Sequence, residues 1–111
     1  MQNKIIKKPW GSEELIELNS KYCLKKLFMK KGHRCSLQYH EKKIETIYVL
    51  DGVLSIEINK KIINLKPNES ITITAGDVHR MSAIESDSCY LESSTPELED
   101  VVRIEDDFGR N

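Results

Sequence analysis

The chain has 111 residues, about the length of one domain and too short for a Rossmann domain plus a substrate domain or for a (β/α)8 barrel. The 17 Lys and Arg residues nearly balance the 18 Asp and Glu residues, which argues against a nucleic-acid-binding protein with the usual basic excess. No apolar run approaches the roughly 18 residues of a membrane span, and the first residues lack the apolar core of a signal peptide.

Turn-forming residues recur along the whole chain and separate short runs rich in Ile, Val, Leu, Thr and Tyr. In chain order, segment 22–28 fits either a helix or a strand, and its context favours a strand. Segments 44–50 and 53–59 flank Asp51-Gly52, the strongest local β-hairpin signal. Near the end, residues 101–104 predict a short strand within an acidic tail.

Several of these runs alternate apolar and polar residues with period two, as half-buried strands do. Short strands at regular spacing of roughly 8–12 residues are typical of a sandwich or a barrel. We therefore predict one all-β domain over residues 1–111. A domain of this size buries only about two thirds of its unfolded surface, so association into a dimer would help to stabilise it.

The residues best suited to chemistry form a quartet in the middle of the chain. Gln38 and His40 are two apart and would share a strand face, Glu45 follows a short polar turn, and His79 follows the Gly76-Asp77 turn. Two imidazoles, a carboxylate and an amide oxygen suit zinc, manganese, iron, cobalt or nickel. The alternative for each histidine is a hydrogen-bonded surface or core residue.

The glycines around this quartet form a recognisable pattern. One stretch resembles the first cupin motif, with Gln38 in place of the first histidine. It runs Gly32, five residues, Gln38-Tyr39-His40, four residues, Glu45, six residues and Gly52. Thr74-Ala75-Gly76-Asp77-Val78-His79 resembles the second cupin motif, with Thr74 at the usual proline position. The resemblance implies a small antiparallel jelly-roll barrel of the cupin type, a fold that is typically dimeric.

The resemblance extends almost end to end to one subfamily, the C-terminal cupin domain of type II mannose-6-phosphate isomerases. That domain is often fused behind a GDP-mannose pyrophosphorylase. The matching stretches are Lys8-Pro9-Trp10-Gly11-Ser12, Ser36-Leu37-Gln38-Tyr39-His40, Gly76-Asp77-Val78-His79-Arg80 and Val102-Arg103-Ile104-Glu105-Asp106-Asp107-Phe108-Gly109-Arg110.

This subfamily resemblance implies an enzyme, a metal-dependent isomerase that interconverts mannose 6-phosphate and fructose 6-phosphate. It also implies that Gln38, His40, Glu45 and His79 bind a divalent metal, with zinc as the first choice and manganese, cobalt, iron or nickel as alternatives. Two departures keep other functions open, because Glu41-Lys42-Lys43 and Thr46 replace histidines that the family carries at the cavity mouth. The alternatives are another cupin enzyme acting on a phosphorylated or nucleotide-activated sugar in surface-polysaccharide synthesis, and a non-catalytic sugar-phosphate-binding module.

A phosphorylated substrate needs basic donors, and all four arginines match subfamily positions. Even spacing before Gln38 would place Arg34 on the cavity face, whereas strict alternation after His79 would turn Arg80 away unless a bulge intervenes. We expect Arg34, Arg80 and Arg110 to bind substrate, with Arg34 and Arg110 as catalytic candidates.

For Arg103, in the acidic tail, surface ion pairing is an equally good interpretation. The sequence does not identify the general base.

We expect a small-molecule sugar phosphate as the ligand, a homodimer, and neither nucleic acid nor membrane as partners. The 111 residues contain no nucleotidyltransferase domain, so a separate nucleotidyltransferase is a candidate partner. The three cysteines are an odd set without CxxC spacing, which argues against a disulfide framework and favours a reducing cytoplasm as the location.

Overall fold

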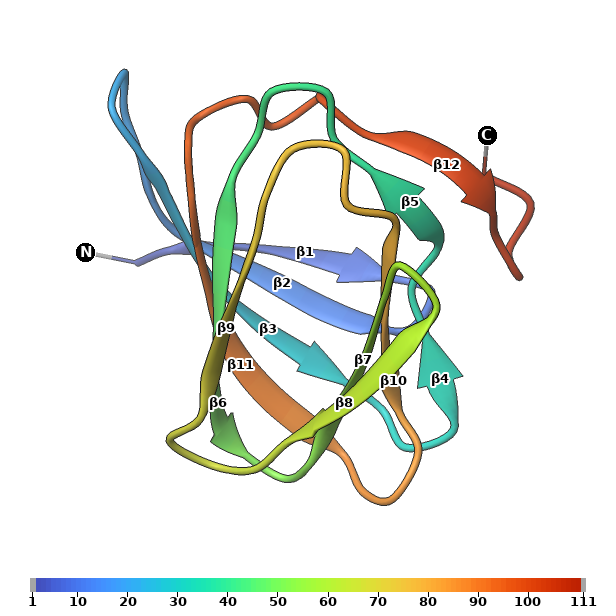
Figure 1. The fold of residues 1–111 in the computed structure, drawn as a ribbon. Helices are drawn as coiled ribbons and strands as arrows, with labels where there is room; N and C mark the ends of the chain where they lie inside the picture. Colours follow the sequence, from blue (N-terminus) through green and yellow to red (C-terminus); the bar gives the residue numbers. More distant parts are fainter. Residues whose placement is uncertain (1, 111) are drawn as a thin grey trace.

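The computed structural model describes residues 2–110, which form two antiparallel sheets and no helix, so no helix in this range could span a membrane (Figure 1). In the first sheet the strand order is β1 (Lys4–Lys8), β2 (Gly11–Leu18), β3 (Cys23–Met29), β11 (Ser88–Ser94), β6 (Glu45–Asp51) and β9 (Ser70–Ile73). In the second sheet it is β12 (Val102–Glu105), β5 (Leu37–Tyr39), β10 (His79–Ala83), β7 (Leu54–Ile58) and β8 (Lys61–Leu65), and β4 (His33–Arg34) also pairs with β10. The predicted all-β fold is confirmed.

The ambiguous segment near residue 25 is strand β3, as its context favoured. It lies between β2 and β11, so both of its edges are hydrogen bonded. Leu27 and Met29 point into the barrel and are buried, while Lys26 and Phe28, which alternate with them, are exposed. A period of two therefore describes this segment, and the helical alternative does not.

The predicted hairpin at Asp51-Gly52 is wrong, because the strands on its two sides belong to different sheets. The turn carries the chain from β6 to β7 across the barrel. Gly52 has a φ of 75°, and a Cβ atom there would lie 2.0 Å from the carbonyl oxygen of Asp87. The two-residue hairpin lies instead between β7 and β8, where Asn59 and Lys60 have φ angles of 48° and 72°, as a type I′ turn requires.

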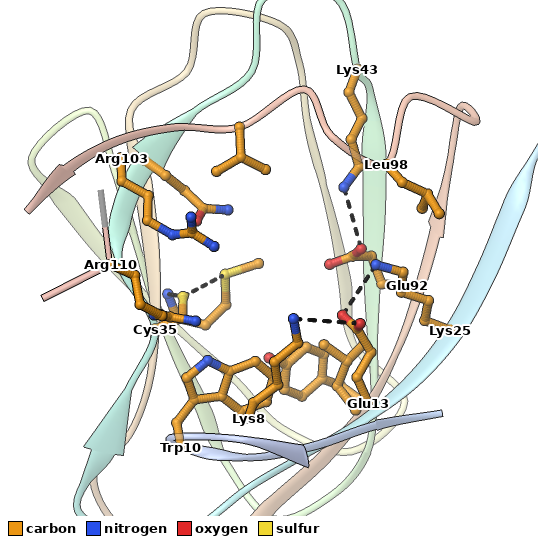
Figure 2. A pocket seen from close by; sticks show the side chains of 15 residues that line it. Lys8, Trp10, Glu13, Lys25, Cys35, Lys43, Glu92, Leu98, Arg103 and Arg110 are labelled. Carbon is orange, nitrogen blue, oxygen red and sulfur yellow. Dashed lines mark hydrogen bonds and ion pairs between the residues drawn. The ribbon is translucent and has the colours of Figure 1, made fainter. Parts of the chain in front are cut away.

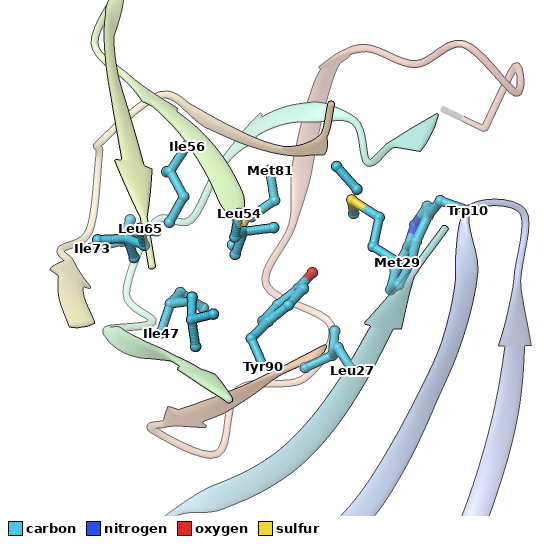
Figure 3. Close-up of a cluster of buried hydrophobic side chains, with 12 residues drawn as sticks. Trp10, Leu27, Met29, Ile47, Leu54, Ile56, Leu65, Ile73, Met81 and Tyr90 are labelled. Carbon is cyan, nitrogen blue, oxygen red and sulfur yellow. The ribbon is translucent and has the colours of Figure 1, made fainter. Parts of the chain in front are cut away.

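Inward-facing side chains change character along the strands. On β6, Glu45 comes first and is followed by Ile47 and Val49, all three buried. The same order recurs on β10, where His79 precedes the buried Met81. One end of the barrel is therefore an apolar core, drawn in Figure 3, and the other end holds ionisable groups.

The C-terminal segment closes the polar end of the barrel. Strand β12 confirms the predicted strand in the acidic tail and lies beside β5 (Figure 1). In this register Arg103 is opposite Gln38, and Gln38 is opposite His79. Directly opposed residues of antiparallel strands project to the same face, so these three side chains form one row across the sheet.

Candidate metal centre and adjoining cavity

Three predicted ligands converge at the polar end of the barrel. His40 follows β5, Glu45 begins β6 and His79 begins β10, and all three are buried. Glu45 Oε1 lies 3.2 Å from His40 Nε2 and 3.1 Å from His79 Nε2, and one donor atom from each residue lies within 4.8 Å of the others. Ligand atoms that share one ion at about 2.0–2.2 Å stand about 3 Å apart, so the spacing suits a common cation.

The backbone fixes the orientation of both imidazole rings. His40 Nδ1 lies 2.6 Å from the carbonyl oxygen of Asp100, and His79 Nδ1 lies 2.8 Å from that of Asp77. A carbonyl oxygen can only accept, so each Nδ1 carries the hydrogen and donates it. In the neutral ring, each Nε2 then turns a lone pair toward the centre, which is the arrangement of metal-bound histidines.

The three converging atoms, two imidazole nitrogens and one carboxylate oxygen, have no positive charge between them. Two neutral imidazoles would face one carboxylate oxygen with lone pairs only, and the buried Nε2 of His79 has no hydrogen-bond partner among the described residues. Burial opposes ionisation of Glu45, but hydrogen bonds from His40 and His79, in the state where each Nε2 carries a proton, and the Lys43 ammonium hold the pKa of its carboxyl well below the usual range. The residues therefore fit a divalent cation, which would join all three donors.

Gln38, the predicted fourth ligand, stands beside His79 in the strand register. Its Oε1 accepts a hydrogen bond of 2.6 Å from Ser36 Oγ. An amide oxygen has a second lone pair that could bind a cation, and the role of Gln38 as a ligand stays a prediction.

Asp100 organises the loop that carries His40 and was not found from the sequence. Its carboxylate accepts hydrogen bonds from the backbone N–H groups of Glu41, Lys42 and Lys43 at 2.9, 2.7 and 2.9 Å. These donors lower the pKa of Asp100 to about 2. Asp100 lies about 60 residues further along the chain, and no local sequence signal indicates this contact.

A cavity of about 130 Å³ adjoins the centre, enough for several water molecules (Figure 2). Gln38, Lys43 and Glu92 line it near the predicted ligands, and Trp10 and Tyr90 lie toward the apolar core. The remaining lining residues are Lys8, Glu13, Lys25, Leu27, Cys35, Met81, Leu98, Val101, Arg103 and Arg110. Five basic residues face two acidic ones, so the cavity favours anions.

Lys43 links the candidate centre to the cavity. It is buried, and its ammonium lies 3.5 Å from Glu45 Oε2 and 3.6 Å from Glu92 Oε2. Burial and the neighbouring Glu45 charge raise the pKa of Glu92 to about 7. From the sequence, Lys43 was placed in a polar turn and among the replacements of family histidines at the cavity mouth, but its contacts with Glu45 and Glu92 were not predicted, and Glu92 was not identified as a site residue.

Arg34 does not face this cavity, contrary to its even spacing from Gln38. Arg34 pairs with Ser82, whereas Gln38 pairs with His79, so four residues on one strand oppose three on the other. The extra residue reverses the face, as a β-bulge does. Arg34 instead donates two hydrogen bonds to Asp107, at 2.6 and 2.8 Å. Its substrate contact stays a prediction.

Arg80 and Arg110 both hold the C-terminal segment. Arg80 turns away from the cavity, as strict alternation indicated, and donates to the carbonyl oxygen of Cys35 and to Glu105. Arg110 lines the cavity and donates to Asp106 Oδ2 and Oδ1 at 2.9 and 3.0 Å. Their roles toward a substrate stay predictions, and of the two only Arg110 reaches the cavity.

Thr46 is not at the cavity mouth, contrary to expectation. It follows the inward-facing Glu45, so its side chain projects to the outer surface of the sheet. Its hydroxyl lies 2.9 Å from that of Thr72 on β9. Of the two departures from the family pattern, only the one at 41–43 alters the cavity, through Lys43.

The jelly-roll barrel, with two histidines and a glutamate converging at one end, defines a cupin. Solved structures similar to this chain support the fold. KdgF from Halomonas sp. covers 86% of each chain with a TM-score of 0.77 and 17% identity. An RmlC-like cupin from Shewanella frigidimarina covers 89% of this chain and 88% of its own, with a TM-score of 0.80 and 18% identity.

Sequence comparison then gives the family. Residues 1–106 match the family described as mannose-6-phosphate isomerase C-terminal, and the chain belongs to it. It is 35% identical over 107 residues to mannose-1-phosphate guanylyltransferase ManC of Salmonella typhimurium and 30% identical over 107 residues to alginate biosynthesis protein AlgA of Pseudomonas aeruginosa. The alignments cover 93% of this chain but only 22% of each relative.

Proposed function

We propose that this chain is a metal-dependent isomerase of a phosphorylated hexose, and that it interconverts mannose 6-phosphate and fructose 6-phosphate. The observation that carries the proposal is the convergence of His40 Nε2, His79 Nε2 and Glu45 Oε1 beside a cavity with a basic excess. Membership of the mannose-6-phosphate isomerase C-terminal family supports the same reaction class.

His40, Glu45 and His79 would hold the metal, with Gln38 as the proposed fourth ligand and zinc as the first choice. When bound, a divalent metal supplies polarisation of the substrate carbonyl and stabilisation of an enediolate. One ligand carboxylate against a divalent charge leaves the site positive, which suits an anionic substrate. Two imidazoles and one carboxylate also leave positions open for substrate oxygens.

Three arginines are the proposed substrate-binding residues. Arg110 lines the cavity and is positioned to contact a substrate there. For Arg34 to act on substrate, as proposed from the family resemblance, its hydrogen bonds to Asp107 would have to open. Arg80 is committed to Cys35 and Glu105 and would act on substrate only after a similar change.

A coupled assay for fructose 6-phosphate formed from mannose 6-phosphate tests the proposal. The protein is loaded in turn with zinc, manganese, cobalt and nickel, and its metal content is measured. Metal-dependent turnover that is lost in His40→Ala supports the isomerase. Absence of turnover in protein with one metal per chain rejects this substrate.

A second candidate is a sugar-phosphate-binding module that acts with a separate nucleotidyltransferase. It is favoured by the replacement of family histidines at 41–43. Mannose 6-phosphate binding without turnover would support it. We also propose a homodimer and a cytoplasmic location, in keeping with the free Cys23, Cys35 and Cys89.

A further inference from the structure

Arg103 occupies a distinctive position on the edge strand β12. It stands in one row with Gln38 and His79 across three neighbouring strands. Two strand spacings separate the backbones of Arg103 and His79, about 10 Å. Figure 2 shows the Arg103 side chain inside the cavity, on the side opposite Lys43 and Glu92.

The other basic side chains of the cavity are already paired with carboxylates. Lys8 and Lys25 share Glu13, at 3.8 and 3.1 Å. Lys43 lies between Glu45 and Glu92, and Arg110 is bound to Asp106. Within residues 2–110, Arg103 is the one cavity cation without an ion pair to a carboxylate.

One donor of the Arg103 guanidinium also lacks a hydrogen-bond partner. Its Nε is buried and has no partner among the residues that the structure describes. A buried charged donor left without an acceptor is costly. An anion that enters the cavity would supply both the missing acceptor and the missing countercharge.

Guanidinium geometry narrows the class of anion. The planar fork of arginine binds two oxygens of a phosphate at once, which a lysine ammonium cannot do. The backbone separation of about 10 Å places Arg103 and His79 at the two ends of the row, which allows a ligand with its anion at one end and metal-binding oxygens at the other, as in a hexose 6-phosphate.

We propose that Arg103, rather than the already paired arginines, binds the phosphate group of a phosphate monoester in this cavity. The choice of a sugar phosphate rests on the proposed function, whereas the anion site rests on the position of Arg103 alone. Arg103 is thereby a substrate-binding residue. The sequence alone had left its role open between a ligand contact and a surface ion pair.

Isothermal titration of the zinc-loaded chain tests the site with mannose 6-phosphate, inorganic phosphate and mannose. We expect Arg103→Gln to weaken mannose 6-phosphate binding by about 10- to 100-fold, the range for loss of a charged hydrogen bond. Arg103→Lys should recover only part of this loss. Lys26→Gln removes the same charge from the exposed face of β3 and is the matched control, with unchanged affinity.

Thermal unfolding separates a binding role from a structural one. Because Nε has no partner, Arg103→Gln should unfold without ligand at or above the wild-type temperature, and phosphate should no longer raise that temperature. A lower unfolding temperature without ligand, together with wild-type affinity, would overturn the proposal. So would wild-type protein that binds neither phosphate nor mannose 6-phosphate.

The outcomes distinguish this site from the isomerase proposal. Arg103-dependent phosphate binding without turnover leaves the anion site standing and rejects the isomerase. Turnover with unchanged mannose 6-phosphate affinity in Arg103→Gln supports the isomerase and rejects the anion site.

Discussion

His40 Nδ1 donates a hydrogen bond of 2.6 Å to the carbonyl oxygen of Asp100, across 60 residues of sequence. The Asp100 carboxylate meanwhile binds the backbone of the loop that follows His40. One residue of the C-terminal segment thus sets both the ring orientation of a candidate ligand and the path of its loop.

Substitution of Asp100 should therefore weaken metal binding without removing a ligand. We expect Asp100→Ala to lower zinc affinity by about tenfold or more, the usual effect of losing a group that orients a ligand. Asp100→Asn keeps one carbonyl acceptor and should fall between Ala and wild type. Competition with a chromogenic chelator measures the affinity, and equal affinity in all three proteins would contradict this role.

The same residue predicts a pH dependence of stability. The pKa of Asp100 is lowered from 3.8 to about 2 by the backbone donors of the loop. A carboxyl whose pKa is lower in the folded state stabilises the fold above its unfolded pKa and loses that effect as pH falls through the folded value. The difference in unfolding temperature between wild type and Asp100→Ala should be constant above pH 5 and shrink between pH 4 and 2. A difference that persists at pH 2 would exclude this mechanism.

The candidate centre itself predicts one metal per chain. Metal-free protein should gain one equivalent of cobalt or zinc and a higher unfolding temperature, because a ligand that binds only the folded state stabilises it. Glu45→Gln and His79→Ala should each lose stoichiometric binding. His33→Ala is the control, since His33 lies outside the centre. Wild-type stoichiometry in both ligand variants would reject the site.

Lys43 should stabilise the metal-free protein through its two carboxylate partners. Lys43→Met leaves Glu45 and Glu92 buried together without their shared ammonium, and removal of one partner of a buried ion pair costs about 3 kcal/mol or more. Adding Glu92→Gln removes the second carboxyl group, whose pKa the lost ammonium no longer lowers, and should recover part of the loss. Urea unfolding of the single and double variants measures this coupling, and simple additivity would contradict it.

Gly52 and Gly32 provide a test of the inter-sheet turn. Both have positive φ, but a Cβ at Gly52 would meet Asp87, whereas nothing lies within 4 Å of one at Gly32. Gly32→Ala should cost about 1 kcal/mol from backbone strain alone. Gly52→Ala should cost clearly more, because the Asp87 backbone must also move. Equal losses of stability in urea unfolding would show that the close approach to Asp87 is unimportant.

The sequence predicted those features that depend on short spacings. Period-two alternation indicated the strands, and the histidine and glutamate pattern led to the three residues that converge. Prediction from the sequence failed where pairing between distant segments decides which sheet a strand joins or which face a side chain occupies. Asp51-Gly52 has ideal hairpin composition, yet β6 and β7 join different sheets. One extra residue between Arg34 and Gln38 reversed a face that even spacing had predicted.

Asp100 was not found from the sequence, and the role of Arg103 was left open, for the same reason. Asp100 carries no local signal, Arg103 could be either a ligand contact or a surface ion pair, and the surroundings of both are created when β12 pairs with β5. The cavity thus has a wall that no local pattern describes.

That wall is an edge strand of four residues, hydrogen bonded on one side to the three-residue β5. Short edge elements open by local unfolding at much lower free energy than the whole fold. Fraying of β12 would release the arginine that faces the cavity and loosen the adjoining Asp100, whose carbonyl orients His40. The residence time of a bound ion would then follow the opening rate of this strand. Hydrogen exchange of the Arg103 amide would report the same opening rate.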